Sequence, residues 1–284
     1  GQQSNNQRYD MLSCLPILTM SQLYNEHTSY TEQQKLTSHK KQNLDGLDAL
    51  ADYLQSNRDK QYNPESDESS NLLPSVFGFI GYVSYDYGRR LEKLPEQTSN
   101  DTHLPIFNGG IYNWNFINDT INRKSYISFH PSCANSLKAK IHKLFEKQLK
   151  HLSPSLHLSK VTTSPHFKLT SYFSSEISKK SYMDSLSHIE KYIKEGDCYQ
   201  VNFSHRHKAQ YIGSPAKAFS ELNSTINTPF SAYLKFDDHE ILSFSPERFI
   251  KVEGDSVETK PIKGTINRGT TKTEDAVLQQ QLLN

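Results

Sequence analysis

The chain has 284 residues, of which 35% are hydrophobic and 22% charged, and its formal net charge at pH 7 is +1. This length can bury a sizeable core as one large domain or two small ones. The near-zero net charge gives no electrostatic case for binding nucleic acid or an anionic membrane. No apolar run approaches the ~20 residues of a membrane span. Cys14, Cys133 and Cys198 are isolated and show neither a disulfide framework nor zinc spacing, which fits a reducing cytoplasm.

The amino-terminal part mixes strand and helix patterns. The apolar run Met11–Met20 predicts one strand, and apolar residues three and four apart predict a helix over residues 44–54. Residues 55–71 are polar with Pro and Ser, which is typical of a surface loop. In Val76–Arg90 the glycine spacing does not match a dinucleotide-binding fingerprint. Glycines among aromatic residues there indicate backbones packed closely together.

The middle of the chain predicts a hairpin, a helix and then a connecting segment. Residues Ile106–Tyr126 alternate apolar and polar positions around Asn118-Asp119, which is a hairpin pattern. Helical spacing follows in Cys133–Leu152, with lysines on the opposite face. Residues 151–176 are rich in Ser, Thr and His and predict a linker. We therefore expect an amino-terminal region over 1–150, this linker over 151–176, and a second region over 177–284.

The second region opens with a strong helix pattern over Ser178–Glu195, where Ser178 is a candidate N-cap and Gly196 a candidate left-handed C-cap. Residues Tyr199–His207 then alternate apolar and polar side chains and predict a strand. Its polar residues Gln200 and Asn202 need hydrogen-bond partners. They fit a site lining and a sheet edge equally well.

Two more helices are predicted further along. Residues Ala216–Leu222 predict a short helix, and the capping-box spacing of Thr271 and Glu274 predicts a helix that runs to the end of the chain.

The stretch Ile241–Arg268 carries the most distinctive combination of charged and apolar residues. Apolar positions near period two predict two strands, with a bulge or sheet edge expected at Pro246. Glu253-Gly254-Asp255 is a turn signal. If this turn closes a hairpin, Glu247 and Lys263 lie at comparable distances on either side of it and can face one pocket.

Lys263 stands in a setting that suits a site. Gly264 allows close approach of a ligand to the backbone, and Thr265 adds a hydroxyl that can orient it. A lysine becomes a nucleophile when its amine is neutral, which requires desolvation or a cationic neighbour.

Glu247 is a candidate general acid, provided that an apolar wall such as Phe244 and Phe249 shields it from water. The same residues fit a plainer reading, in which Glu247 and Arg248 form a surface ion pair on one strand and Lys263 is a solvated turn lysine.

Five blocks of sequence, in order along the chain, resemble the chorismate-utilising enzymes, and most closely their aminodeoxychorismate synthase component I branch. The blocks are Phe77-Gly-Phe-Ile-Gly-Tyr82 with Tyr85-Asp-Tyr-Gly-Arg-Arg90, Gly110-Ile-Tyr-Asn-Trp114, Gly196-Asp-Cys-Tyr-Gln-Val-Asn202, Ser245-Pro-Glu-Arg-Phe249 and Pro261-Ile-Lys-Gly-Thr265. One block alone would be a weak signal, whereas five in the same order are specific.

The resemblance implies an α+β fold of two large, mainly antiparallel sheets packed as a sandwich and flanked by helices. It implies a reaction in which ammonia replaces the C4 hydroxyl of chorismate, on the route to 4-aminobenzoate and folate. Lys263 would attack the ring at C2, and the hydroxyl would leave with a proton from Glu247. The substrate-binding positions implied are Gly264, Thr265, Asn202 and Gln200.

Position 263 distinguishes branches of the family. Anthranilate synthases usually carry Ala in this motif, so Lys263 favours the aminodeoxychorismate branch, and Asn202 supports it. Anthranilate or isochorismate synthase is the alternative within the family. The resemblance further implies Mg²⁺, which would neutralise a substrate carboxylate, and ammonia delivered by a glutamine amidotransferase subunit, component II.

The resemblance also implies an amino-acid pocket, which binds tryptophan in several family members. Its positions in this chain are Arg8, Pro229, Phe230 and Ser231. The serine motif that completes the pocket in the family would fall at or before residue 1. Arg8 and Asp10 are equally compatible with an ordinary surface ion pair.

In the resembled family the sequence continues well past the position of Asn284. The acidic Mg²⁺ ligands and the groups that bind the chorismate carboxylates lie there. We therefore expect a fragment truncated at both ends, with its metal ligands beyond Asn284 and little or no activity by itself. A non-catalytic module that binds an amino acid or docks an amidotransferase is the alternative from another functional class.

Overall fold

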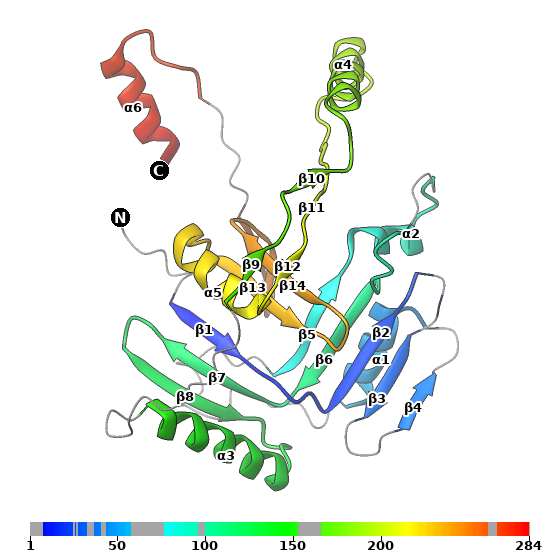
Figure 1. Cartoon of the computed structure of the whole chain (residues 1–284), viewed down its shortest axis with the longest axis vertical. Coiled ribbons are helices and arrows are strands. Elements are labelled where there is room, and N and C mark those ends of the chain that lie inside the picture. The colour runs from blue at the N-terminus through cyan, green and yellow to red at the C-terminus, as the bar shows by residue number, and fades with distance from the viewer. Residues whose placement is uncertain are drawn as a thin grey trace. The chain divides into compact units, whose positions relative to one another are not determined.

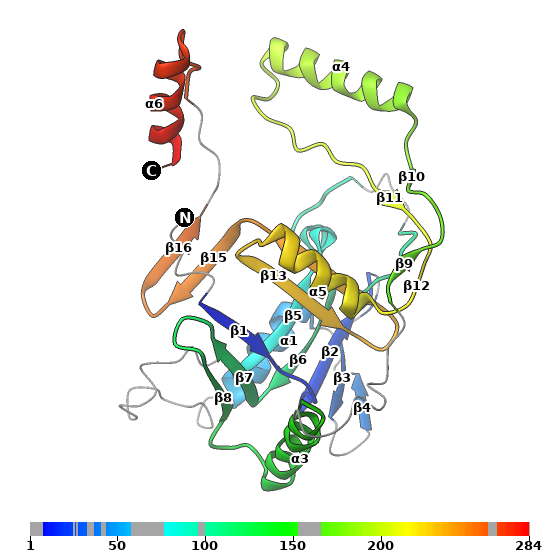
Figure 2. The ribbon, with the colours of Figure 1, turned by 60° about the vertical axis from the view of Figure 1, so that its left-hand side comes forward.

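The computed structural model describes residues 8–24, 26, 28–32, 37–40, 44–57, 77–95, 100–152, 166–260 and 266–283. The chain divides into two compact units, Gly1–His157 and Leu158–Asn284. Figure 1 and Figure 2 together label the helices and strands of both. Each unit combines helices with antiparallel strand pairs, so the expected α+β class is confirmed.

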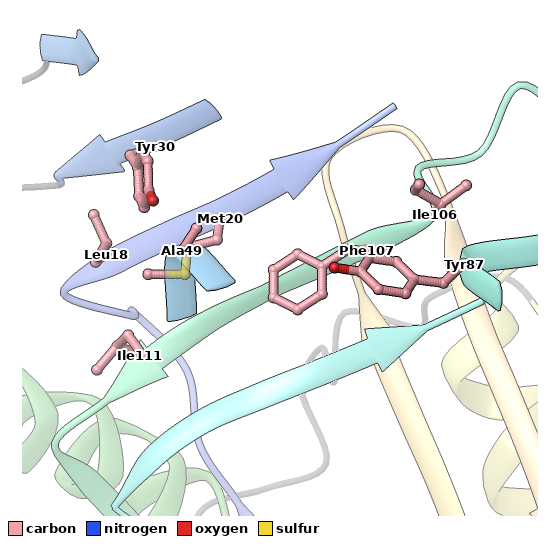
Figure 3. Close-up of a cluster of buried hydrophobic side chains, with 8 residues drawn as sticks. All are labelled: Leu18, Met20, Tyr30, Ala49, Tyr87, Ile106, Phe107 and Ile111. Atoms are coloured by element: carbon pink, nitrogen blue, oxygen red, sulfur yellow. The ribbon is translucent and has the colours of Figure 1, made fainter. Parts of the chain in front are cut away.

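A five-stranded antiparallel sheet forms the larger layer of the first unit, in the order β4-β3-β2-β6-β5. Its strands are β2 (Leu18–Gln22), β3 (Ser29–Glu32), β4 (Thr37–Lys40), β5 (Gly78–Val83) and β6 (Phe107–Tyr112). Helix α1 (Gly46–Ser56) packs on this sheet through the fully buried Ala49, as the helical spacing over 44–54 predicted. Figure 3 shows the core side chains gathered along β2 and β6, with Phe107 between α1 and Tyr87.

The close approach of α1 to β6 gives a test of this core. A Cβ added at Gly46 would lie 2.6 Å from Cδ1 of the buried Phe107 ring. Alanine normally favours a helix over glycine, but overpacking costs about 1–3 kcal/mol. We expect Gly46→Ala to destabilise the protein by that amount in denaturant titrations followed by circular dichroism. The matched change Gly88→Ala, which meets nothing within 4 Å, should be neutral or stabilising; equal effects at both positions would contradict the packing.

The prediction of a single strand over Met11–Met20 is wrong. Strand β1 (Tyr9–Leu12) pairs with β7, whereas β2 belongs to the five-stranded sheet. Leu15 between them has a left-handed φ of 55° and precedes Pro16. A left-handed residue followed by a proline ends a strand, so the chain leaves one sheet and enters the other.

The second sheet of this unit has the order β1-β7-β8 and contains a hairpin, but its turn follows Asp119, so the expected turn residues Asn118-Asp119 end a strand instead. Strand β7 (Trp114–Asp119) turns at residues 120–123 into β8 (Lys124–Phe129). Helix α3 (Asn135–Leu152) contacts it through Phe145, whose ring lies 6.2 Å from that of Trp114 and 5.3 Å from that of Phe116. The 3-10 turn η5 (Tyr85–Tyr87) and α2 (Gly88–Leu91) complete the described elements of the unit.

Two short strand pairs and a helix open the second unit. Strand β9 (Lys168–Leu169) pairs with β12 (Tyr211–Ile212), and β10 (Ser174–Ser175) pairs with β11 (His207–Lys208), so the end of the segment expected as a linker takes part in strand pairing. Helix α4 (Lys179–Glu195) has the predicted caps. Ser178 Oγ accepts a hydrogen bond from Ser181 N, and Gly196 is left-handed with φ 81°.

The rest of the second unit is built from two hairpins. Helix α5 (Pro215–Ile226) packs on the hairpin of β13 (Phe230–Lys235) and β14 (Glu240–Ser245), as Figure 2 shows. The Phe219 ring of α5 stacks on Phe244 with centroids 5.3 Å apart. Strands β15 (Arg248–Glu253) and β16 (Ser256–Lys260) form the other hairpin, and α6 (Lys272–Leu283) follows.

Candidate functional site

Glu247 lies in the two-residue connection between β14 and β15. Ser245 Oγ accepts a hydrogen bond from Glu247 N at 3.3 Å and donates to Glu247 O at 2.8 Å. A short serine side chain that bonds to the backbone two residues further on is a common turn device. Pro246 therefore sits in a turn between two hairpins, and the bulge expected beside it occurs instead between Arg248 and Lys251.

The hairpin predicted at Glu253-Gly254-Asp255 is confirmed. Gly254 has a left-handed φ of 57°, and the register of β15 and β16 places Arg248 opposite Lys260. Lys263, Gly264 and Thr265 lie outside the described residues. The last residue described before them, Lys260, lies across the hairpin from Arg248, the residue after Glu247.

The surroundings of Glu247 differ from the expectation in two ways. The Phe249 side chain is 87% exposed, so it forms no apolar wall beside the carboxylate, whereas Phe244 packs against α5. Arg248 does not pair with Glu247. Its Nη1 donates to Glu258 Oε1 on β16, so the surface Glu247–Arg248 pair considered from the sequence is not formed.

Gln200 and Asn202 lie on an exposed segment, and the strand predicted over Tyr199–His207 is wrong except at its last residue. The face of this segment that the alternation predicted to be buried is open to solvent, with Tyr199 93% exposed and Val201 41% exposed. A strand requires a neighbouring strand, and residues 199–206 pair with none in the part of the chain that the structure describes. No contact in that part joins Gln200 or Asn202 to Glu247.

The segment expected to line an amino-acid pocket begins β13. Ser231 Oγ lies 2.7 Å from Thr228 Oγ1 and 3.2 Å from Thr228 O, which closes a small turn over Pro229. Phe230 is opposite Ser245 in the β13–β14 register, so this segment adjoins the Glu247 turn. Structure thus brings two of the sequence-predicted site segments together within one unit.

Arg8, the remaining residue of the expected pocket, belongs to the first unit and has a partner there. Its Nη2 donates to Asp119 Oδ2 at 2.7 Å, and its Nε lies 3.1 Å from the same oxygen. Asp10 instead accepts a hydrogen bond from Asn118, so the Arg8–Asp10 pair considered from the sequence is not formed. The sequence indicated Asp119 only as part of a hairpin turn and not as the ion-pair partner of Arg8. Its place in a predicted hairpin was the one signal available for this pairing.

The Arg8–Asp119 pair predicts an acid-dependent loss of stability. The guanidinium of Arg8, aided by donors from Asn122, holds the pKa of Asp119 well below its usual range. A depressed native pKa stabilises the fold above the unfolded-state pKa of about 4, and this contribution is lost as the pH falls through the native pKa. We expect Asp119→Asn to lower the melting temperature above about pH 5, with the difference from wild type shrinking on acidification.

Melting curves by circular dichroism across this pH range measure the effect. Asp10→Asn is the matched control, because Asp10 lies on the same pair of strands but is exposed and accepts from a neutral amide. A pH-independent difference for Asp119→Asn would contradict the role assigned to the ion pair.

Neither a metal site nor a membrane span emerges from these residues. Within the ranges that the structure describes, no group of three or more His, Cys, Asp or Glu side chains is arranged to hold a metal ion. Of the helices in those ranges, none is long and apolar enough to cross a bilayer.

A family model described as chorismate binding enzyme matches residues 8–284, which is nearly the whole chain. The chain belongs to the chorismate-binding enzyme family. The resemblance to this family carried by the five sequence blocks is therefore confirmed.

Among curated relatives, the chain is 32% identical to aminodeoxychorismate synthase component 1 of Salmonella typhimurium, over 98% of this chain and 55% of that protein. It is 36% identical to the Klebsiella aerogenes protein of the same name, over 75% of this chain and 44% of the relative. An anthranilate synthase component 1 of Haloarcula marismortui is 30% identical over 74% of this chain and 42% of the relative. The chain thus spans about half the length of the curated relatives it matches.

The fold has a counterpart among solved structures. Anthranilate synthase component I from Streptococcus pneumoniae matches with a TM-score of 0.69 at 19% sequence identity, over 100% of this chain and 60% of that one. At this identity the match establishes the fold alone, and it agrees with the α+β architecture of the two units.

Proposed function

We propose that this chain is part of an aminodeoxychorismate synthase component I, which converts chorismate and ammonia to 4-amino-4-deoxychorismate on the route to 4-aminobenzoate and folate in the cytoplasm. The observation that carries the proposal is the lysine at position 263 of the Pro261-Ile-Lys-Gly-Thr265 block, which separates this branch of the family from the anthranilate synthases. The relatives named aminodeoxychorismate synthase component 1, at 32% and 36% identity, support this branch.

In the proposed reaction, neutral Lys263 Nζ forms a bond to C2 of the chorismate ring, and both ring double bonds shift by one position toward C4. The C4–oxygen bond breaks, and the hydroxyl leaves as water with a proton from Glu247. Ammonia then forms a bond to C4, both double bonds shift back, and the C2–nitrogen bond breaks to release neutral lysine, while the new ammonium group returns a proton to the Glu247 carboxylate. Splitting one displacement into two steps is the usual benefit of a covalent nucleophile.

The remaining site residues would bind substrate. Gly264 and Thr265 follow the nucleophile, and we assign them contacts to the ring and its substituents. We assign Asn202 and Gln200 to the same substrate, and we assign Arg8, Pro229, Phe230 and Ser231 to an amino-acid pocket that takes tryptophan. Because these positions lie partly in separate units or outside the described residues, the assignments rest on the family motifs.

The proposal includes Mg²⁺ and a partner subunit. The metal would neutralise a carboxylate of chorismate. The residues that the structure describes hold no cluster of three or more candidate ligands, and the proposal assigns none of them to the metal. Ammonia would come from a glutamine amidotransferase, component II.

Product analysis tests the proposal. The whole product of the gene would be incubated with chorismate, Mg²⁺ and ammonium, and the products identified by mass spectrometry. We expect 4-amino-4-deoxychorismate. Anthranilate or isochorismate as the main product would place the protein in another branch of the family, and tryptophan binding without any turnover would indicate a non-catalytic module.

The 284-residue chain would be assayed in parallel. We expect it to have little or no activity by itself, and Mg²⁺-dependent consumption of chorismate by the purified chain would overturn that expectation.

A further inference from the structure

The candidate catalytic residues are attached to two hairpins with separate backbone ladders. Among the described strands, β13 pairs with β14 and β15 pairs with β16. Glu247 lies in the connection between the hairpins, whereas Lys263 follows the free end of β16. The orientation of the connection that carries Glu247 therefore depends on how one hairpin is held against the other.

Arg248 contacts both hairpins. Its guanidinium carbon lies 4.8 Å from the centre of the Phe230 ring on β13. Its Nη1 donates to Glu258 Oε1 on β16, and the Arg248 side chain is 22% exposed. A planar guanidinium can stack on a ring and donate hydrogen bonds in its plane at the same time, which a lysine ammonium does less well.

The backbone around Arg248 aims the side chain at these partners. A bulge between Arg248 and Lys251 interrupts the ladder, and bulges redirect side chains and increase local twist. Glu258 also approaches Lys260, with Oε2 3.4 Å from Nζ. The carboxylate that holds Arg248 thus lies two residues before the end of β16, directly ahead of the segment that carries Lys263.

We propose that Arg248 is a positioning residue for Glu247. By bridging Phe230 on β13 and Glu258 on β16, it fixes the connection that carries Glu247 between the two hairpins. Its kinetic consequence rests on the proposed function, whereas its structural consequence does not. Arg248 acts through Glu247, so its loss should affect the alignment of reacting groups more than substrate affinity.

Steady-state kinetics of the whole gene product test the kinetic consequence. Misplacement of a reacting group by about 1 Å can cost on the order of 100-fold in rate. We expect Arg248→Met to lower kcat by about this factor while KM changes by less than about threefold, which is the signature of an interaction made in the transition state. Arg248→Lys keeps a positive charge for Glu258 but loses the stacking on Phe230. We expect its kcat to lie between those of wild type and Arg248→Met.

The matched control is Arg206→Met. Arg206 also pairs with a glutamate of this unit, since its Nε donates to Glu176 Oε2 at 2.7 Å, but neither residue of that pair belongs to β13, β14, β15 or β16. We expect wild-type kcat from it. A rise in KM with kcat unchanged in Arg248→Met would mean that Arg248 binds substrate directly and would overturn the positioning role.

Hydrogen–deuterium exchange gives a readout that does not depend on activity. Amides of β16 (Ser256–Lys260) should exchange faster in Arg248→Met and in Phe230→Leu than in wild type or Arg206→Met. Unchanged exchange in both variants would overturn the proposal. If Arg248→Met fails to fold, Arg248→Lys and Phe230→Leu decide the matter. If wild type makes no aminodeoxychorismate, the proposed function fails and the exchange result alone decides the role of Arg248.

Discussion

Replacing Lys263 with alanine should reduce the formation of 4-amino-4-deoxychorismate by at least about 1,000-fold. Removal of a covalent nucleophile typically costs this much or more, because the two-step route is lost while binding is retained. Initial rates with saturating ammonium, with the product separated and identified by mass spectrometry, measure the loss. Any turnover that persists should carry water or ammonia directly to C2, as expected when alanine occupies this motif.

The control for this change is Lys251→Ala. Lys251 is a partly exposed lysine of β15 that pairs with Glu253 on its own strand. It should leave the rate unchanged. A Lys263→Ala protein that keeps its rate of 4-amino-4-deoxychorismate formation would contradict the nucleophile assignment, and with it the reason for preferring this branch of the family.

Glu247→Gln should lower kcat for the same reaction by roughly 100- to 10,000-fold, the usual contribution of a positioned general acid. Glutamine keeps the size of the side chain and the turn formed with Ser245, since those hydrogen bonds use only the backbone of residue 247. The loss of kcat therefore measures the contribution of proton donation by Glu247, separate from any change in the turn. Stopped assays at saturating chorismate, with circular dichroism to verify folding, measure it.

Glu253→Gln is the matched variant for this experiment, because Glu253 ends β15, the strand that begins directly after Glu247, and its side chain is 75% exposed. It should behave as wild type. If Glu247→Gln raises KM and leaves kcat intact, Glu247 contributes to binding and another group donates the proton.

Elements with local signals were predictable from sequence. Ser178 and Gly196 mark the ends of α4 because a cap is formed by residues adjacent in the chain. The capping box at α6 is half formed. Thr271 Oγ1 accepts from Glu274 N, but the Glu274 carboxylate accepts from Thr270 N and Oγ1.

Elements that depend on distant partners were not predictable in this way. The alternation in Tyr199–His207 matches a strand, yet pairing requires a neighbour supplied by another part of the chain. In the same way, an apolar run is compatible with one strand or two, and only the conformation of Leu15 before Pro16 separates β1 from β2.

The residues of the candidate site show the same difference between local and long-range signals. Glu247 and Lys263 were recognisable because their motifs are contiguous in sequence. Arg248 as a bridge was not, since its link to Glu258 depends on the register after a bulge, and its link to Phe230 depends on the contact of two hairpins. A diagonal Arg–Glu pair across a hairpin becomes visible only when that register is known.

The single tryptophan of the chain has a practical consequence for all of these measurements. Trp114 is 1% exposed, and its Nε1 donates to Cys14 O at 2.7 Å, within the first unit. Intrinsic fluorescence of this indole therefore reports the melting of Gly1–His157 and does not directly report the unfolding of the unit that carries Glu247. A protein of two units need not unfold in one transition. For a variant such as Arg248→Met, a fluorescence midpoint equal to that of wild type would show that the first unit is folded. It would not test the folding of the second unit, which carries the substitution.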